Sequence, residues 1–174
     1  MATMERKEHL KALKDSQLTL ENTLEGMDSN LFSLKSTTDT WSIAEILEHI
    51  MMVETGVINN LKRLGGNAGV HPQNTPLGNS EVIEKSQNRD TLVNAPEMFI
   101  PKGTFKGLSV ALKAFQQHRK KIEIFVSTTQ IPLKNIAFPH PRLGLLNGEN
   151  WLAFIAGHCL RHVVQIKQII AAQK

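Results

Sequence analysis

Two histidines, His158 and His162, lie one helical turn apart in the apolar segment NGENWLAFIAGHCLRHVVQIKQII. Residues four positions apart project from the same face of an α-helix, so the two imidazoles would stack on consecutive turns. Two imidazole nitrogens on one face can converge on a divalent metal ion, which needs them at about 2.0 to 2.1 Å. The alternative is a pair of core histidines that donate to backbone carbonyls. Two in register on an apolar face favour the metal site.

A third candidate ligand, His49, lies about two turns into the segment WSIAEILEHIMMVETGVINNL, at the edge of its apolar side. The start of this predicted helix of about 22 residues is well marked. Ser42 and Glu45 match a capping box, and Trp41 can pack on Ile46 as a hydrophobic staple. Three neutral imidazoles would leave a fourth position on the ion for water or substrate, which is typical of a catalytic rather than a structural site.

Three motifs in the chain resemble those of one known family. They are Trp-Ser-x-x-Glu-x-x-x-His from Trp41, His-Pro-x-Leu-Gly from His140, and His-x-x-x-His-x-x-Gln from His158. Together they resemble the DinB-like superfamily of metal-binding four-helix bundles, including its YfiT-like branch. The resemblance implies that His49, His158 and His162 bind a divalent metal, usually zinc or nickel. Members include thiol-dependent S-transferases, a thiol-dependent isomerase and proteins named as metal-dependent hydrolases, so a low-molecular-weight thiol is a second expected cofactor.

Apolar residues recur with helical spacing in four long segments, at about residues 4–28, from Trp41 onward, at about 106–128, and at 147–170. None of these segments shows persistent two-residue alternation, and four amphipathic stripes with nothing else to cover them favour an all-α four-helix bundle. The chain of 174 residues is 41% hydrophobic and has no break in composition. We therefore expect a single domain over residues 1–174.

A long crossover, from about residue 65 to 105, separates the second and third long helices. It begins with a glycine-rich run and contains four prolines, with a short helix expected in SEVIEKSQNRDTL; the prolines are Pro72, Pro76, Pro96 and Pro101. Such a crossover lets the two helices that it joins run parallel. The segment QIPLKNIAFPHPRLGLL is expected to be a second loop, and it leads into Asn147, a predicted N-cap of the last helix.

Four other side chains are candidates for a role near the histidines. Arg119 lies on the apolar face of the third helix, where it either extends to solvent or lines the metal pocket and holds an anionic substrate group. Glu45 could act as a base for metal-bound water or only as the helix cap. Gln165 could orient the His162 ring or bound water, or be an ordinary polar position. His140 could reach the mouth of the site or only shape its loop.

Composition excludes some classes of protein. The amino-terminal residues are charged and no apolar run approaches 18 residues, so we expect neither a secretory signal nor a membrane span, and a cytoplasmic location. The single cysteine, Cys159, cannot form an internal disulfide and is interpreted as a small core residue. The net charge of +4 comes from scattered Lys and Arg, with no Tyr for base stacking, which disfavours nucleic-acid binding. An exposed apolar face on such a bundle favours a homodimer.

The leading hypothesis from these residues is a metal-dependent enzyme. The metal would lower the pKa of bound water or thiol, for hydrolysis or thiol transfer to a small electrophile. No unambiguous general base accompanies the histidines, so a non-catalytic bundle that binds a metal or small ligand is the alternative. A purely structural bundle is a third possibility. The metal, thiol and substrate are not identified by sequence.

Overall fold

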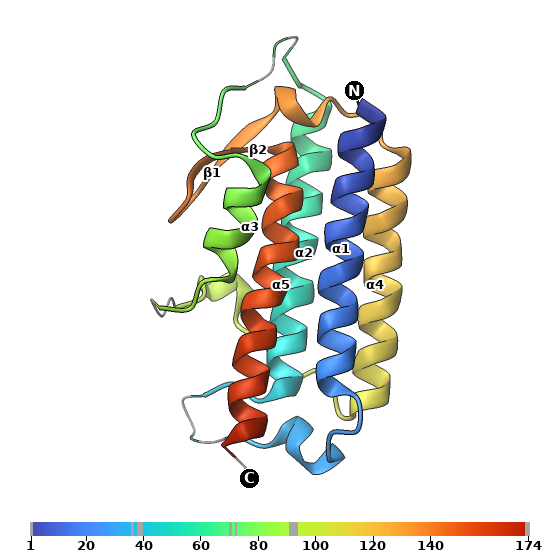
Figure 1. The fold of residues 1–174 in the computed structure, drawn as a ribbon, viewed down its shortest axis with the longest axis vertical. Coiled ribbons are helices and arrows are strands. Elements are labelled where there is room, and N and C mark those ends of the chain that lie inside the picture. The colour runs from blue at the N-terminus through green and yellow to red at the C-terminus, as the bar shows by residue number, and fades with distance from the viewer. Residues whose placement is uncertain are drawn as a thin grey trace.

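Four long helices form most of the protein and run along its length (Figure 1). The computed structural model describes residues 2–35, 37, 40–69, 71, 73–90 and 94–172. The helices are α1 (Ala2–Leu24), α2 (Ile43–Gly65), α4 (Leu108–Thr128) and α5 (Gly148–Ala171). In this view α1 and α5 descend while α2 and α4 ascend. The predicted all-α four-helix bundle is confirmed, and the crossover leaves α2 and α4 parallel.

Each of the four long helices buries the apolar stripe that its sequence predicts. α1 and α2 both pack against α4 and α5. Fully buried residues from all four helices include Leu13, Leu20, Ile46, Ile50, Leu61, Ala111, Phe115, Ile155 and Ile166. Burial of one such large side chain contributes about 1.5 to 3 kcal/mol, so the stripes rather than any ligand hold the bundle together. α1 ends at Leu24 instead of near residue 28, and Gly26 follows in the left-handed region at φ 68°.

Side-chain caps set the starts of the two helices that carry the histidines. At α2, the Ser42 hydroxyl accepts from the Glu45 amide, and the Glu45 carboxylate accepts from the Ser42 amide at 2.9 Å. At α5, Asn147 and Asn150 exchange equivalent bonds at 3.0 and 3.2 Å. Both predicted caps are confirmed, and they fix where each helix begins relative to its histidines.

The crossover carries the predicted short helix, α3 (Asn79–Gln87), and a 3₁₀ turn, η2 (Glu97–Phe99). α3 packs against α5 at Gly157, the residue before His158, where an added Cβ would lie 2.6 Å from the Ile83 carbonyl oxygen. A glycine is therefore required for this close approach. The parts of the crossover prediction that fall on Pro72, Thr91 and Leu92 lie outside the described residues.

The second connection is not the irregular loop that the sequence suggested, and this prediction was wrong. After the 3₁₀ turn η3 (Leu133–Asn135), the chain forms an antiparallel hairpin of β1 (Ala137–His140) and β2 (Gly144–Asn147). Strands of four residues are too short to show a clear alternating pattern. Gly144, at φ 75°, accommodates the tight turn between them.

A further 3₁₀ turn, η1 (Ser29–Ser33), follows α1, and Asp28 caps it by accepting from the Asn30 amide. In the part of the chain that the structure describes, no helix has the length and apolar character needed to cross a membrane.

Candidate metal centre

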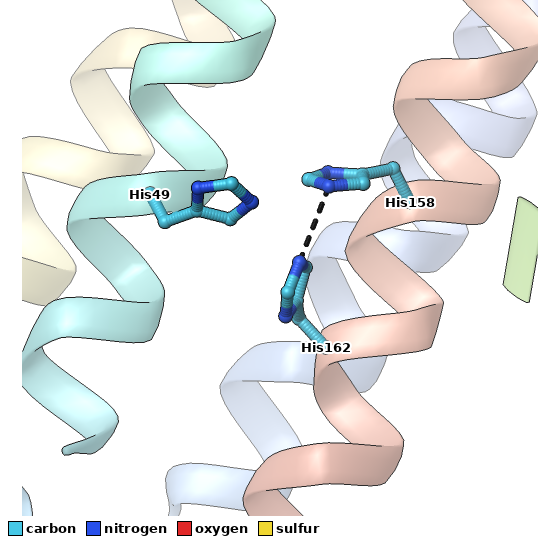
Figure 2. A group of neighbouring side chains, drawn as sticks. All are labelled: His49, His158 and His162. Atoms are coloured by element: carbon cyan, nitrogen blue, oxygen red, sulfur yellow. Dashed lines mark hydrogen bonds between the residues drawn. The ribbon is translucent and has the colours of Figure 1, made fainter. Parts of the chain in front are cut away.

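The three predicted ligands meet between α2 and α5, as Figure 2 shows. His49 comes from α2, and His158 and His162 come from consecutive turns of α5. One potential ligand nitrogen from each ring lies within 4.8 Å of the other two. The Nε2 atoms of His158 and His162 are 3.2 Å apart. Two nitrogens at that separation, each about 2.05 Å from an ion, would subtend about 100° at it, which is close to tetrahedral. The predicted convergence of the three rings is confirmed.

Hydrogen bonds on the far side of two rings place the proton on Nδ1 and leave Nε2 of each ring unprotonated. His49 Nδ1 lies 2.8 Å from the Phe99 carbonyl oxygen, which can only accept, so Nδ1 carries the proton. His162 Nδ1 lies 2.9 Å from Gln165 Oε1, and Arg89 donates to the same oxygen at 3.1 Å. An amide oxygen can only accept, and the bond from Arg89 identifies this atom as the oxygen, so His162 Nδ1 also carries the proton. Gln165 thus contacts His162 as an orienting residue would.

The His158 ring differs from the other two. Its Nδ1 is buried and has no hydrogen-bond partner among the described residues. Its Nε2 lies 3.2 Å from the unprotonated Nε2 of His162 and can donate to it when no ion is bound. A shared divalent ion would satisfy both nitrogens at once, so the donor set fits a metal bound by neutral imidazoles.

Burial keeps all three imidazoles uncharged near neutral pH. His49, His158 and His162 are 5%, 9% and 6% exposed. Burial lowers the pKa of His49, although the Phe99 carbonyl partly opposes this. Burial, followed by the charge of His49, lowers the pKa of His162 to about 3, and burial holds the pKa of His158 well below its usual value. Metal ligation requires deprotonated nitrogens, and this site supplies them without competition from protons at pH 7.

The segment that follows Phe99 is held by Glu48, a residue that the sequence analysis did not single out. Its carboxylate accepts from the Lys102 amide at 3.1 Å and from the Thr104 amide and hydroxyl at 2.9 and 2.5 Å. These bonds outweigh the effect of burial and lower the pKa of Glu48. The crossover is thereby fastened to α2 beside Phe99. An acidic residue next to His49 was a visible signal, but its partners lie more than 50 residues away.

Glu45 serves as the cap that the sequence predicted. Its carboxylate accepts from the Ser42 amide and hydroxyl, and Lys35 forms an ion pair with it at 2.7 Å. These contacts outweigh the effect of partial burial and lower the pKa of Glu45. A catalytic role for Glu45 stays a prediction.

Both interpretations of Arg119 need correction. Its side chain is only 1% exposed, so it does not extend to solvent. It does contact an anion, but this is Glu54 of α2, at 2.7 Å, and not a substrate. The guanidinium also donates to the Leu13 carbonyl and the Ser16 hydroxyl, both at 3.1 Å. Arg119 therefore joins α4 to α1 and α2 inside the bundle, because the chain supplies a buried carboxylate for it.

His140 both shapes its turn and reaches the edge of the site. Its Nδ1 accepts from the Arg142 and Leu143 amides, which fixes the tip of the hairpin. Its ring centroid lies 4.7 Å from that of Phe154, which lies 5.2 Å from that of His158. The hairpin is thus connected to the three histidines through one aromatic ring.

Cys159 lies beside His158 in the chain but not in the site. It is fully buried, and burial raises the pKa of its thiol to about 12. This confirms that Cys159 is a core residue, since a nucleophilic thiol needs a lowered pKa and access to solvent.

Comparison with known proteins gives matches over nearly the whole chain. The uncharacterized protein YuaE of Bacillus subtilis is 24% identical over 156 residues, which is 89% of this chain and 93% of YuaE. The structure of YfiT from Bacillus subtilis aligns with a TM-score of 0.58 at 14% identity, covering 97% of this chain and 87% of YfiT. YfiT is described as a probable metal-dependent hydrolase with an unusual four-helix bundle topology. The model of the DinB superfamily matches residues 7–166, and the chain therefore belongs to that superfamily.

Proposed function

We propose that this protein is a metal-dependent enzyme that directs a water or a small thiol onto a small electrophile, as a hydrolase or a thiol S-transferase. The observation that carries the proposal is the convergence of three neutral imidazoles, from His49, His158 and His162. One nitrogen of each ring lies within 4.8 Å of a nitrogen of each of the other two. The description of YfiT as a probable metal-dependent hydrolase supports the same class of function.

A divalent ion such as zinc or nickel, when bound, would lower the pKa of a coordinated water or thiol. The chain contributes the geometry. Phe99 and Gln165 orient His49 and His162, so that their unprotonated Nε2 atoms face the other rings. Three protein ligands leave an open coordination position, as catalytic sites do.

One observation favours the alternative, a bundle that binds a metal or a small ligand without turnover. The ligand cluster contains histidines only, and in the described part of the chain no carboxylate belongs to it. A hydrolase needs a group that moves protons, and no residue that touches the three rings is an evident base.

The experiment is elemental analysis of the purified protein, followed by assays with esters and with thiol–electrophile pairs. We expect one equivalent of zinc or nickel, and turnover that a chelator removes and the same metal restores. His49→Ala is the matched variant and should lose both metal and turnover. Stoichiometric metal without turnover would favour the non-catalytic alternative, and a protein with no metal would favour a structural bundle. Light scattering of the same sample tests the predicted homodimer.

A further inference from the structure

Three arginines lie around the histidine cluster, none of which the sequence analysis selected. Arg89 follows α3 and donates to Gln165 Oε1 at 3.1 Å, the oxygen that also accepts from His162. Arg161 precedes His162 in α5 and donates to the carbonyl of Asn88, the residue before Arg89. The segment after α3 and the middle of α5 therefore bring the guanidinium groups of Arg89 and Arg161 close to the His162 ring.

The third arginine, Arg142, comes from the tip of the β1–β2 hairpin. Its backbone amide donates to His140 Nδ1, and the His140 ring packs on Phe154, which packs on His158. The hairpin tip therefore brings a third positive charge to the side of the cluster where His158 lies. Arg142 also lies close enough to His140 for its charge to disfavour a second positive charge there. Like charges placed together repel, which is unfavourable unless an anion offsets them.

The described residues supply little negative charge beside Arg89 and Arg142. Among them, no Asp or Glu forms an ion pair with Arg89 or Arg142 within 4.0 Å. Arg89 uses only one guanidinium nitrogen in its described hydrogen bonds, the one that contacts Gln165. The histidine cluster adds no negative charge, because its members are neutral and it includes no carboxylate. A divalent ion would make the region more positive still.

We propose that Arg89, Arg142 and Arg161 form a binding site for the oxyanion of the substrate or thiol, a carboxylate or phosphate, beside the histidine cluster. The proposal rests on the proposed function, since it assigns the class of molecule that reaches that cluster. Guanidinium groups suit such a ligand because they can hold two of its oxygens at once. The role that the sequence suggested for Arg119 thus falls to other arginines.

The test compares two thiols of equal size, 3-mercaptopropionate and its neutral amide, 3-mercaptopropionamide. Both are titrated into the cobalt-substituted protein, and thiolate binding is followed by the visible absorption of the cobalt. Hydrogen bonds to charged groups lead us to expect that the carboxylate binds at least about tenfold more tightly. Arg89→Gln and Arg142→Gln should each reduce this preference severalfold, without changing the affinity for the amide. Arg142 is exposed, so its variant is the safer test of binding if the others alter the fold.

Arg63→Gln is the matched control, because it removes the same charge from the last turn of α2, 14 residues and about 21 Å along the helix from His49. It should leave the preference unchanged. Competition by acetate or by inorganic phosphate identifies the preferred oxyanion, and failure of both to compete would contradict the proposal. Equal binding of both thiols to the wild-type protein would overturn it while leaving the metal site intact. If neither thiol changes the cobalt spectrum, but acetate or phosphate still binds to the wild type and not to Arg89→Gln, the thiol function fails and the anion site stands.

Discussion

The histidine cluster and the Glu54–Arg119 pair are two polar interruptions of one apolar core, and they differ in where their hydrogen bonds end. Arg119 and Glu54 are 1% and 0% exposed and bond to each other. His118 adds a contact to the second Glu54 oxygen at 3.0 Å. Both carboxylate oxygens of Glu54 thus have partners inside the chain, and Nε is the one guanidinium nitrogen of Arg119 without a partner among the described residues. At the histidine cluster, by contrast, Nδ1 of His49 and Nδ1 of His162 bond outward, and Nδ1 of His158 has no partner among the described residues. The Nε2 atoms of His158 and His162 face each other at 3.2 Å.

This difference teaches how to interpret a polar residue on an apolar stripe. Both clusters break the hydrophobic pattern, so the break itself does not identify a site. A pair whose groups satisfy each other inside the chain serves the fold, and a buried pair of this kind specifies how helices align more than it adds stability. A cluster with lone pairs aimed at one point needs something that the chain does not supply.

The largest effect should follow from removal of a ligand. His162→Ala should reduce the metal content from about one equivalent to near zero, because two remaining imidazoles cannot complete the site. The protein should stay helical and monodisperse, since the four buried stripes hold it together. Elemental analysis and circular dichroism measure the two properties. His71→Ala, which changes a histidine outside the cluster, should leave both unchanged, and unfolding of His162→Ala would mean that the site is structural.

Breaking the Glu54–Arg119 pair should show the opposite pattern. Glu54→Ala leaves a buried guanidinium without its carboxylate and should cost about 3 to 5 kcal/mol of unfolding free energy. The metal content should not change. Urea denaturation measures the loss. The double variant Glu54→Leu with Arg119→Met should recover most of it, because a packed apolar pair replaces an ion pair without an orphaned charge. A loss of metal in the double variant would show that the two clusters are not independent.

Helical phase explains why the ligands could be predicted and Arg119 could not. His158 and His162 share a face by their spacing alone, and the caps at Ser42 and Asn147 gave the helix starts. The partner of Arg119 depends instead on which residue of another helix lies opposite, and Glu54 is 65 positions away. Spacing along one helix is local information, whereas register between helices is set by packing of the whole core.

The same reasoning applies to what surrounds the ligands. Gln165 was predicted because it shares the face of His162 three residues on. Phe99 and Arg89 were not, because they belong to the long crossover, and its sequence does not indicate where it packs on α2 and α5. Their contacts arise where that crossover is fastened to α2 by Glu48 and packed on α5 at Gly157. Long-range contacts of this kind leave no pattern in a single sequence.

The pH dependence of stability should report on the histidine cluster. The pKa values of the three histidines are lowered in the folded protein, that of His162 to about 3, from the usual histidine value of 6.5. Below about pH 6.5 the unfolded chain thus binds more protons than the folded chain does. The metal-free protein should therefore lose stability as the pH falls from about 6.5 toward 3. The slope is about 1.4 kcal/mol per pH unit for each histidine that is protonated only on unfolding. Urea denaturation at several pH values measures it, and His162→Leu should lower the slope by one such increment.

A smaller effect is expected where a side chain only orients a ligand. Gln165→Leu removes the acceptor for His162 Nδ1 and should weaken metal affinity about 10- to 100-fold, as loss of such a contact typically does. Competition with a chromophoric chelator measures the affinity. Gln168→Leu is the matched control, since Gln168 is exposed on the same helix and is not a member of the cluster. Equal affinity in both variants would mean that the His162–Gln165 bond does not act on the metal.

The smallest effect should come from Glu45→Gln. Glutamine also serves at this position of a capping box, so only the partly exposed ion pair with Lys35 is lost, and pairs at the surface contribute about 0 to 1 kcal/mol. The lowered pKa of Glu45 makes its carboxylate a weak base. We therefore expect unchanged turnover, measured with whichever substrate the wild-type protein accepts. A general base would behave differently, because its loss typically lowers the rate about 10²- to 10⁴-fold. Ser42→Ala sharpens the comparison: it should cost about 1 kcal/mol of stability at the same cap without any effect on turnover.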